Sequence, residues 1–169
     1  MATATHLPIE QYLATSYHPD CDYIDGEIEE RNLGEREHAR LQAALTIWFG
    51  ARVKTWNLEV LVEQRVRVSP QRIRIPDVCL VSLDAPYEKV ITTPPFVVVE
   101  ILSPEDRVAH YNDRLEDYRR MGVANIWVAD PEERRGFDWN AGWQERTRFQ
   151  VPNSPLYLDL AEVFSSLPQ

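Results

Sequence analysis

The sequence predicts an α/β (α+β) fold in which one mixed β-sheet is flanked by helices, with extra β elements at both ends of the chain. Apolar residues recur at helical spacing between residues 35 and 54, which indicates a long amphipathic helix. Residues 76–82 and 96–102 are short apolar runs with the length and β-branched composition of buried strands. With 169 residues, the chain has the length of a single domain with one core of moderate size.

The N-terminal region is expected to add a short helix and a β-hairpin to this fold. Residues 8–13 are typical of a short helix that carries a proline in its first turn. Residues 22–29 alternate polar and apolar side chains around Asp25-Gly26, a dipeptide typical of hairpin turns. Three strands are expected after the long helix, at residues 58–68, 76–82 and 96–102.

A second helix is expected to begin at Ser103 and to end at Met121. Serine is a good N-cap, Pro104 suits the first helical position, and Gly122 is a natural residue just beyond a helix end. The order helix, three strands, helix, strand is completed by an apolar strand at residues 125–129. Weaker strands and a short terminal element are expected at residues 136–139, 143–149 and 160–164. We therefore divide the single domain, residues 1–169, into an N-terminal extension (1–34), a core (35–130) and a C-terminal β extension (131–169).

Charge and cysteine content restrict the function classes. A formal net charge of −9 argues against a protein that coats nucleic acid through bulk electrostatics. The cations are 16 arginines and only two lysines, Lys54 and Lys89, so a lysine-dependent mechanism has few candidates. The first residues do not resemble a signal peptide, and the longest apolar runs are too short to span a membrane. We expect a cytoplasmic protein in which Cys21 and Cys79 are reduced thiols, with a disulfide as the less favoured alternative.

Two acidic residues interrupt apolar strands and are the main candidates for chemistry. Asp77 lies in the string Ile75-Pro76-Asp77-Val78, and Glu100 follows three consecutive valines. A buried carboxylate is costly without a metal, a cation or hydrogen-bond donors, and side chains alternate between the faces of a strand. If the two strands are adjacent, both carboxylates can point at one spot and form a divalent-metal site. Asp77 as a turn aspartate and Glu100 as the partner of a buried arginine remain open alternatives.

Four further residues, all on the two long helices, are weaker candidates. Glu37 lies on the apolar stripe of the first long helix at its sheet-facing end, although a first-turn glutamate is also favoured by the helix dipole. His38 lies on the flank of the same stripe and is a possible hydrogen-bonding neighbour. Arg107 and Arg114 lie two turns apart at the edge of the apolar stripe of the second helix, where either could reach a phosphate or belong to a solvated face.

An ordered set of strings resembles the Uma-type putative restriction endonuclease family, a branch of the PD-(D/E)XK nuclease superfamily. The strings span most of the chain in the order typical of that family: 23–27 (YIDGE), 37–40 (EHAR), 75–78 (IPDV), 99–104 (VEILSP), 118–123 (YRRMGV) and 127–131 (WVADP). The resemblance implies a restriction-endonuclease-like αβββαβ core. It also implies metal ligation by Asp77 and Glu100, with an acidic residue on the first helix, for which Glu37 is the candidate.

The resemblance further implies an Mg²⁺- or Mn²⁺-dependent DNA endonuclease that pairs two sites as a homodimer. The lysine expected two residues after the glutamate is replaced by Leu102. In this family a lysine on the following helix commonly substitutes for it, and the matching position here holds Arg114. Arginine stays protonated, so it can stabilise charge on a phosphate but cannot act as a base. Lys89 is a second candidate cation, and a catalytically weak or inactive nuclease-fold protein that binds nucleic acid or another protein is the alternative function.

Overall fold

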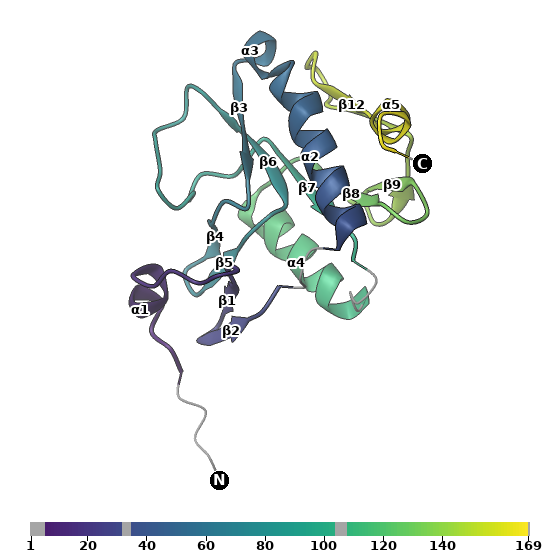
Figure 1. The fold of residues 1–169 in the computed structure, drawn as a ribbon. Coiled ribbons are helices and arrows are strands. Elements are labelled where there is room, and N and C mark those ends of the chain that lie inside the picture. Colours follow the sequence, from purple (N-terminus) through teal and green to yellow (C-terminus); the bar gives the residue numbers. More distant parts are fainter. Residues whose placement is uncertain (1–5, 32–34, 104–107, 169) are drawn as a thin grey trace.

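The computed structural model describes residues 6–31, 35–103 and 108–168, with the side chains of residues 108–110 left aside (Figure 1). The helices are α1 (Ile9–Leu13), α2 (Arg36–Gly50), α3 (Val53–Trp56), α4 (Val108–Met121) and α5 (Leu160–Ser165). The strands of the first two sheets up to residue 101 are β1 (Asp22–Ile24), β2 (Glu27–Glu29), β3 (Leu58–Val62), β4 (Val66–Ser69), β5 (Arg72–Arg74), β6 (Val78–Ser82) and β7 (Val97–Ile101). The later strands are β8 (Ile126–Asp130), β9 (Arg135–Asp138), β10 (Gln144–Glu145), β11 (Arg148–Gln150) and β12 (Tyr157–Asp159).

The central element is a six-stranded mixed sheet with the order β10-β9-β8-β7-β6-β3. Strands β3, β6 and β7 run antiparallel to one another, β8 is parallel to β7, and β9 is antiparallel to β8. The parallel pair requires a crossover, which α4 supplies between β7 and β8. Together with α2, these elements form the predicted αβββαβ core: α2, β3, β6, β7, α4 and β8.

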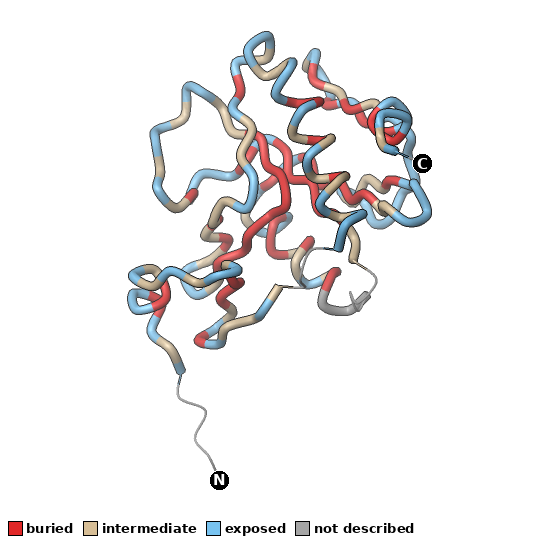
Figure 2. Tube along the Cα trace, viewed as in Figure 1, coloured by how far each residue is buried: buried red, intermediate tan, exposed pale blue. Residues whose placement is uncertain are grey.

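Helices α2 and α4 cover the two faces of this sheet (Figure 1), and the tube in Figure 2 shows that the strands between them are buried. On one face, the apolar stripe of α2 packs against alternate residues of β6 and β7 such as Val78 and Val99. On the other face, Leu115 and Tyr118 of α4 pack against Cys79 and Val98. The two-residue period of each strand therefore decides which side chains meet which helix.

Two smaller sheets flank the core. Strands β2-β1-β5-β4 form a four-stranded antiparallel sheet whose apolar side packs with α1, and Val66 and Val68 of β4 join the apolar cluster beneath α4. Strands β11 and β12 form a two-stranded sheet, and residues of α5 contribute to the apolar cluster on the α2 face. The β elements predicted at the two ends of the chain are divided between sheets: β1, β2, β11 and β12 lie in the smaller sheets, whereas β9 and β10 extend the central one.

Two local predictions need correction, and a third is not tested. The strand predicted at residues 58–68 is two strands in different sheets, because the chain turns at Glu63, which has a positive φ of 49°. The helix predicted at residues 35–54 ends at Gly50 and is followed by the separate short helix α3. Asn57, the residue after α3, has a left-handed backbone conformation that ends this helix. The predicted helix start at Pro104 lies outside the described residues.

The end of α4 agrees with the prediction. Gly122 has a φ of 103°, the amide of Gly122 donates to the carbonyl of Arg119, and the amide of Val123 donates to the carbonyl of Tyr118. This is a Schellman arrangement, which satisfies carbonyls that the helix leaves open.

Cys21 and Cys79 are both buried free thiols. None of the helices in the described part of the chain is long and apolar enough to cross a membrane.

Candidate active site

Asp77 and Glu100 meet at one end of the β6–β7 ladder. Val78 pairs with Val99 in an antiparallel register, so the next position outward places Asp77 opposite Glu100. The Oδ2 atom of Asp77 accepts a hydrogen bond of 2.7 Å from the amide of Ile101, which fixes this carboxylate beside β7. Both residues are buried, with exposed fractions of 2% and 0%. The structure thus brings together the two carboxylates that the strand pattern singles out.

The Asp77 carboxylate is held by the side chains of Arg31 and His38. Its Oδ1 atom lies 2.8 Å from Nη2 of Arg31 and 3.2 Å from Nε2 of His38. Burial alone would raise the pKa of Asp77, but the contacts with His38, Arg31 and the Ile101 amide outweigh burial and lower this pKa. Asp77 is therefore ionised at neutral pH.

Glu100 has the opposite electrostatic character. Burial raises its pKa to about 8, and the negative charge of Asp77 adds to this shift while Arg114 opposes it. The hydroxyl of Tyr118 donates a 2.6 Å hydrogen bond to Oε1, whereas Oε2 has no hydrogen-bond partner among the described residues. A buried carboxyl oxygen without a partner is costly, so Glu100 is the unsatisfied member of the pair.

Arg114 reaches the pair from α4. Its Nη1 atom lies 3.6 Å from Oε2 of Glu100, and its Nη2 atom lies 3.5 Å from Oδ2 of Asp22. The side chain of Arg114 is 15% exposed, and its Nε atom is buried without a hydrogen-bond partner among the described residues. Glu100 therefore does lie beside an arginine, as the alternative interpretation expected. This arginine is Arg114, which is itself one of the predicted site residues.

A buried network of charged side chains holds Arg114 in place, and the local sequence pattern does not predict it. Arg74 is 2% exposed and binds Asp22 at 3.0 Å and Asp117 at 2.8 Å. Asp22 also accepts a hydrogen bond of 3.1 Å from the amide of Ile75, directly before the Pro76-Asp77 dipeptide. The network ties β1, β5 and α4 to the end of β6, which positions Arg114 against Glu100.

The first turn of α2 contributes His38 to the site, while Glu37 is exposed in the same turn. Glu37 is not among the described partners of Asp77 or Glu100, and its predicted role is thus a proposal. One turn further along α2, Nε2 of Gln42 donates a 3.0 Å hydrogen bond to the backbone carbonyl of Asp77. Helical spacing from His38 to Gln42 explains why both reach the same strand end.

Arg107 and Lys89 are the other candidate cations. Arg107 lies outside the described residues. Lys89 is exposed, and its loop is fixed to β4, because the Ile91 amide donates to the Arg65 carbonyl and Gln64 donates to the Lys89 carbonyl. Leu102, which stands where a lysine is usual, packs partly buried against the apolar cluster beneath α4.

The donor set fits a divalent cation that takes only part of its ligands from protein. In the described ranges, no group of three or more His, Cys, Asp or Glu side chains is arranged to hold a metal ion. Mg²⁺ commonly binds through one or two carboxylates and keeps waters and substrate phosphates as its other ligands. The Oε2 atom of Glu100, which has no hydrogen-bond partner among the described residues, and the Asp77 carboxylate meet this requirement.

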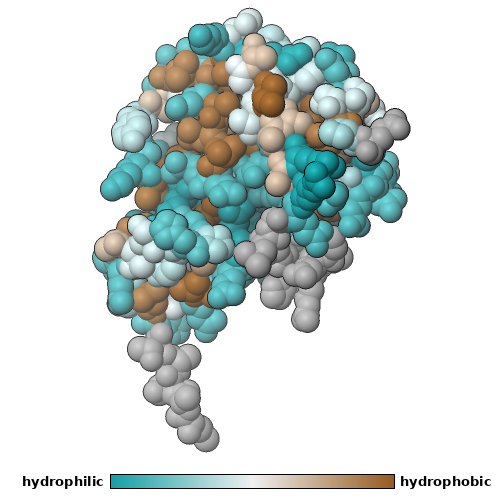
Figure 3. All heavy atoms as spheres, viewed as in Figure 1, coloured by the Kyte–Doolittle hydropathy of each residue, from teal (hydrophilic) through white to brown (hydrophobic). Residues whose placement is uncertain are grey.

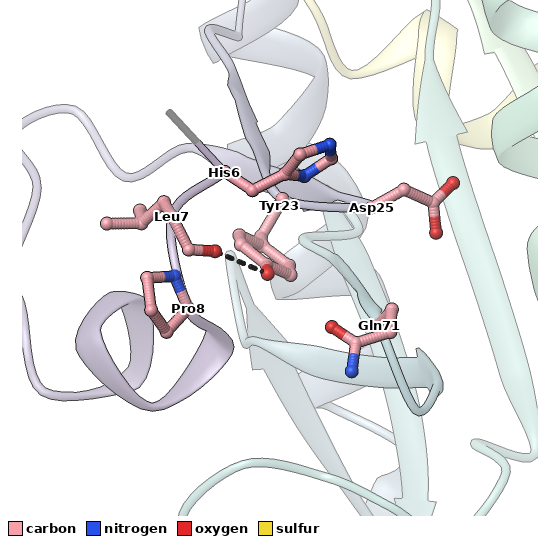
Figure 4. A pocket seen from close by; sticks show the side chains of 7 residues that line it. His6, Leu7, Pro8, Tyr23, Asp25 and Gln71 are labelled. Atoms are coloured by element: carbon pink, nitrogen blue, oxygen red, sulfur yellow. Dashed lines mark hydrogen bonds between the residues drawn. The ribbon is translucent and has the colours of Figure 1, made fainter. Parts of the chain in front are cut away.

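The molecular surface has a hydrophilic region at one end of α2 and a hollow beside the N-terminal hairpin. Strongly hydrophilic side chains cover the N-terminal end of α2 in Figure 3, where Arg36 is exposed and Arg40 is partly exposed. A separate hollow of about 400 Å³ lies beside the β1–β2 hairpin, where the Tyr23 hydroxyl donates to the Leu7 carbonyl (Figure 4). The residues lining this hollow include neither Asp77 nor Glu100, so it is separate from the candidate active site.

Comparisons with known proteins identify the fold and the family of the chain. No curated protein matches the chain. A crystal structure of a putative nuclease belonging to DUF820 from Anabaena variabilis shares the fold with a TM-score of 0.78 and 19% sequence identity, over 93% of this chain and 97% of that chain. The family model of Uma2, described as putative restriction endonuclease, matches residues 9–165. The chain therefore belongs to the Uma2 putative restriction endonuclease family, as the ordered strings predicted.

Proposed function

We propose that this protein is a divalent-cation-dependent endonuclease that hydrolyses phosphodiester bonds in DNA. The observation that carries the proposal is the pair of buried carboxylates, Asp77 and Glu100, at the end of two adjacent strands, with Oε2 of Glu100 lacking a hydrogen-bond partner among the described residues. Membership in a family of nucleases supports the reaction class. A purely structural core would gain stability by losing both carboxylates, so their presence favours a functional site.

The two carboxylates would hold Mg²⁺ or Mn²⁺, which supplies Lewis-acid polarisation of the phosphate and lowers the pKa of water. Asp77 is already ionised and fixed by the Ile101 amide, so it is ready to bind a cation. Arg114 stays protonated and lies beside Glu100, where its planar fork can bind a phosphate oxygen and stabilise developing charge. Glu37 assists from the first turn of α2, directly or through water, and His38 positions Asp77.

The local positive charge supports a nucleic-acid substrate. Although the whole chain is acidic, Arg36 and Arg40 lie in the first turns of α2, close to His38. Backbone phosphates of DNA can contact these arginines without a large basic surface. Cutting both strands of a duplex favours a homodimer with one site for each strand, and the expected compartment is the cytoplasm.

A plasmid assay tests the proposal. Supercoiled DNA is incubated with the parent protein in Mg²⁺ or Mn²⁺, and with Asp77→Asn, Glu100→Gln and Glu37→Gln. We expect cutting by the parent and a loss in the first two variants that exceeds the roughly 10- to 100-fold effect of outer-shell changes. Glu59→Gln, a change at an exposed residue of β3, serves as the matched control. Equal cutting by all variants would point to a contaminant and would refute the proposal, and a parallel RNA substrate tests the preference for DNA.

A second function is favoured by specific contacts. Leu102 replaces the usual lysine, and each carboxylate already faces an arginine, Arg31 or Arg114. A nuclease-fold protein of weak or absent activity, which binds nucleic acid or another protein, is compatible with these contacts. Calorimetric titration with Mn²⁺ separates the two functions, because such a binding module requires no carboxylate-dependent cation binding.

A further inference from the structure

Arg31 occupies one oxygen of the Asp77 carboxylate. It lies in the connection between β2 and α2, and its Nη2 atom is 2.8 Å from Oδ1 of Asp77. The arginine side chain is 12% exposed and the aspartate side chain 3%, so both members of the pair are largely buried. A cation that binds Oδ1 therefore competes with Arg31 for this oxygen.

The two oxygens of Asp77 are not equally available. Oδ2 is held by the Ile101 amide within the strand ladder, whereas Oδ1 is bound by the side chains of Arg31 and His38. Side-chain partners can rotate away without disturbing the sheet, but a ladder amide cannot. Oδ1 is therefore the oxygen that can change partners, and a positive guanidinium and a divalent cation on the same oxygen repel each other.

A second acceptor for Arg31 lies within reach. Nη1 of Arg31 is 3.9 Å from Oε1 of Glu63, whose side chain is 53% exposed. Gln42 lies between the two acidic residues, because its Nε2 atom donates to the Asp77 carbonyl at 3.0 Å and lies 3.4 Å from Oε1 of Glu63. Arg31 can therefore leave Asp77 and remain paired with a carboxylate.

We propose that Arg31 takes the place of a divalent cation on Asp77 and moves to Glu63 when the cation binds. The inference rests on the proposed function, because it requires a cation at Asp77 and Glu100. In the cation-free protein Arg31 keeps a buried carboxylate paired, which avoids the cost of an isolated buried charge. Cation binding is then an exchange of one positive partner of Asp77 for another, and Arg31 is a positioning residue that sets cation affinity.

Calorimetric titration of the full chain with Mn²⁺ tests the exchange. Arg31→Gln should lower the dissociation constant at least about tenfold, since the variant removes the competing charge from Oδ1. Arg31→Lys should stay close to the parent, because lysine retains the positive charge. Arg36→Gln is the matched control, since it removes the same charge from an exposed position in α2 and should leave the affinity nearly unchanged.

A double-mutant cycle with Glu63 separates exchange from general electrostatics. Glu63→Gln should weaken Mn²⁺ binding in the parent, because the displaced arginine loses its second partner. The same change should have a smaller effect in the Arg31→Gln background, where no arginine is displaced. Equal effects in both backgrounds would overturn the exchange.

The parent protein provides a readout that does not depend on the folding of any variant. Phenylglyoxal modification of Arg31, followed by mass spectrometry, should increase severalfold when Mn²⁺ is added, as the side chain moves to the more exposed Glu63. Unchanged labelling, or unchanged affinity in Arg31→Gln while the parent binds Mn²⁺, would overturn this inference alone. If neither the parent nor Arg31→Gln binds Mn²⁺ more tightly than Asp77→Asn, the cation role in the proposed function fails as well.

Discussion

Replacing Glu100 by glutamine isolates the cost of burying this carboxylate. The pKa of Glu100 is raised from 4.5 to about 8, first by burial and then by the charge of Asp77. Between these two pH values the folded state keeps a proton that the unfolded state has lost, so the parent loses stability as the pH rises through this window. A glutamine side chain cannot ionise, so the Glu100→Gln variant escapes this loss.

The magnitude follows from the size of the shift. At about 1.36 kcal/mol for each pKa unit, raising the pKa of Glu100 to about 8 corresponds to roughly 4 to 5 kcal/mol. The glutamine keeps an oxygen that can accept the hydrogen bond from the Tyr118 hydroxyl. Any unfavourable contact of the new amide with Arg114 does not depend on pH, so it cancels when pH slopes are compared.

Urea unfolding in the presence of EDTA, at about pH 5, 6.5 and 8, measures this slope. The stability of Glu100→Gln relative to the parent should increase steadily over this range, by a total of several kcal/mol. Glu116→Gln is the control: hydrogen bonds from Arg119 lower the pKa of Glu116 to about 2, so this residue titrates below the range. Parallel profiles for the parent and Glu100→Gln would refute the assignment of a neutral, buried Glu100. At neutral pH, Mn²⁺ binding should release about one proton in the parent, detectable as a buffer-dependent enthalpy.

Two further changes test the framework of the site by urea unfolding. Arg74→Met should destabilise the protein by about 3 kcal/mol or more, because buried Asp22 and Asp117 lose their shared cation. A loss of stability below about 1 kcal/mol would contradict the role given to this network. Gly122→Ala should cost about 1 to 2 kcal/mol because of its φ of 103°, whereas Gly50→Ala, at an open helical position, should be neutral or stabilising. Equal effects of the two glycine changes would remove the backbone explanation.

The core fold and the carboxylate pair could be predicted because both depend on short-range periodicity. The apolar stripe of α2 and the runs that became β6 and β7 fix which faces are buried. Within each strand, alternation places Asp77 on the face of Cys79 and Glu100 on the face of Val98. Once β6 and β7 are neighbours, the meeting of the two carboxylates follows, and the structure confirms that Cys79 pairs with Val98.

The supporting network could not be predicted, because its contacts join residues that are distant in sequence. Asp22 belongs to an alternating segment that is typical of a half-exposed hairpin, yet it is 0% exposed. Its burial arises from tertiary contacts: β1 pairs with β5, and Arg74 and Arg114 approach the carboxylate from two elements. The break at Glu63 was missed for a similar reason, since nothing in the local apolar pattern shows that β3 and β4 join different sheets.

The missing lysine can be understood from the same contacts. The position of Leu102 shares the face of Glu100, and there Leu102 packs against the apolar cluster beneath α4 instead of supplying a charge. The positive charge instead comes from Arg114 beside Glu100 and from Arg31 beside Asp77. Neither arginine can accept a proton from water, because a guanidinium stays protonated. The exchange proposed above places a divalent cation at Asp77 instead of Arg31. The site then reaches the state in which both carboxylates are ionised through cation binding, and not through a basic side chain.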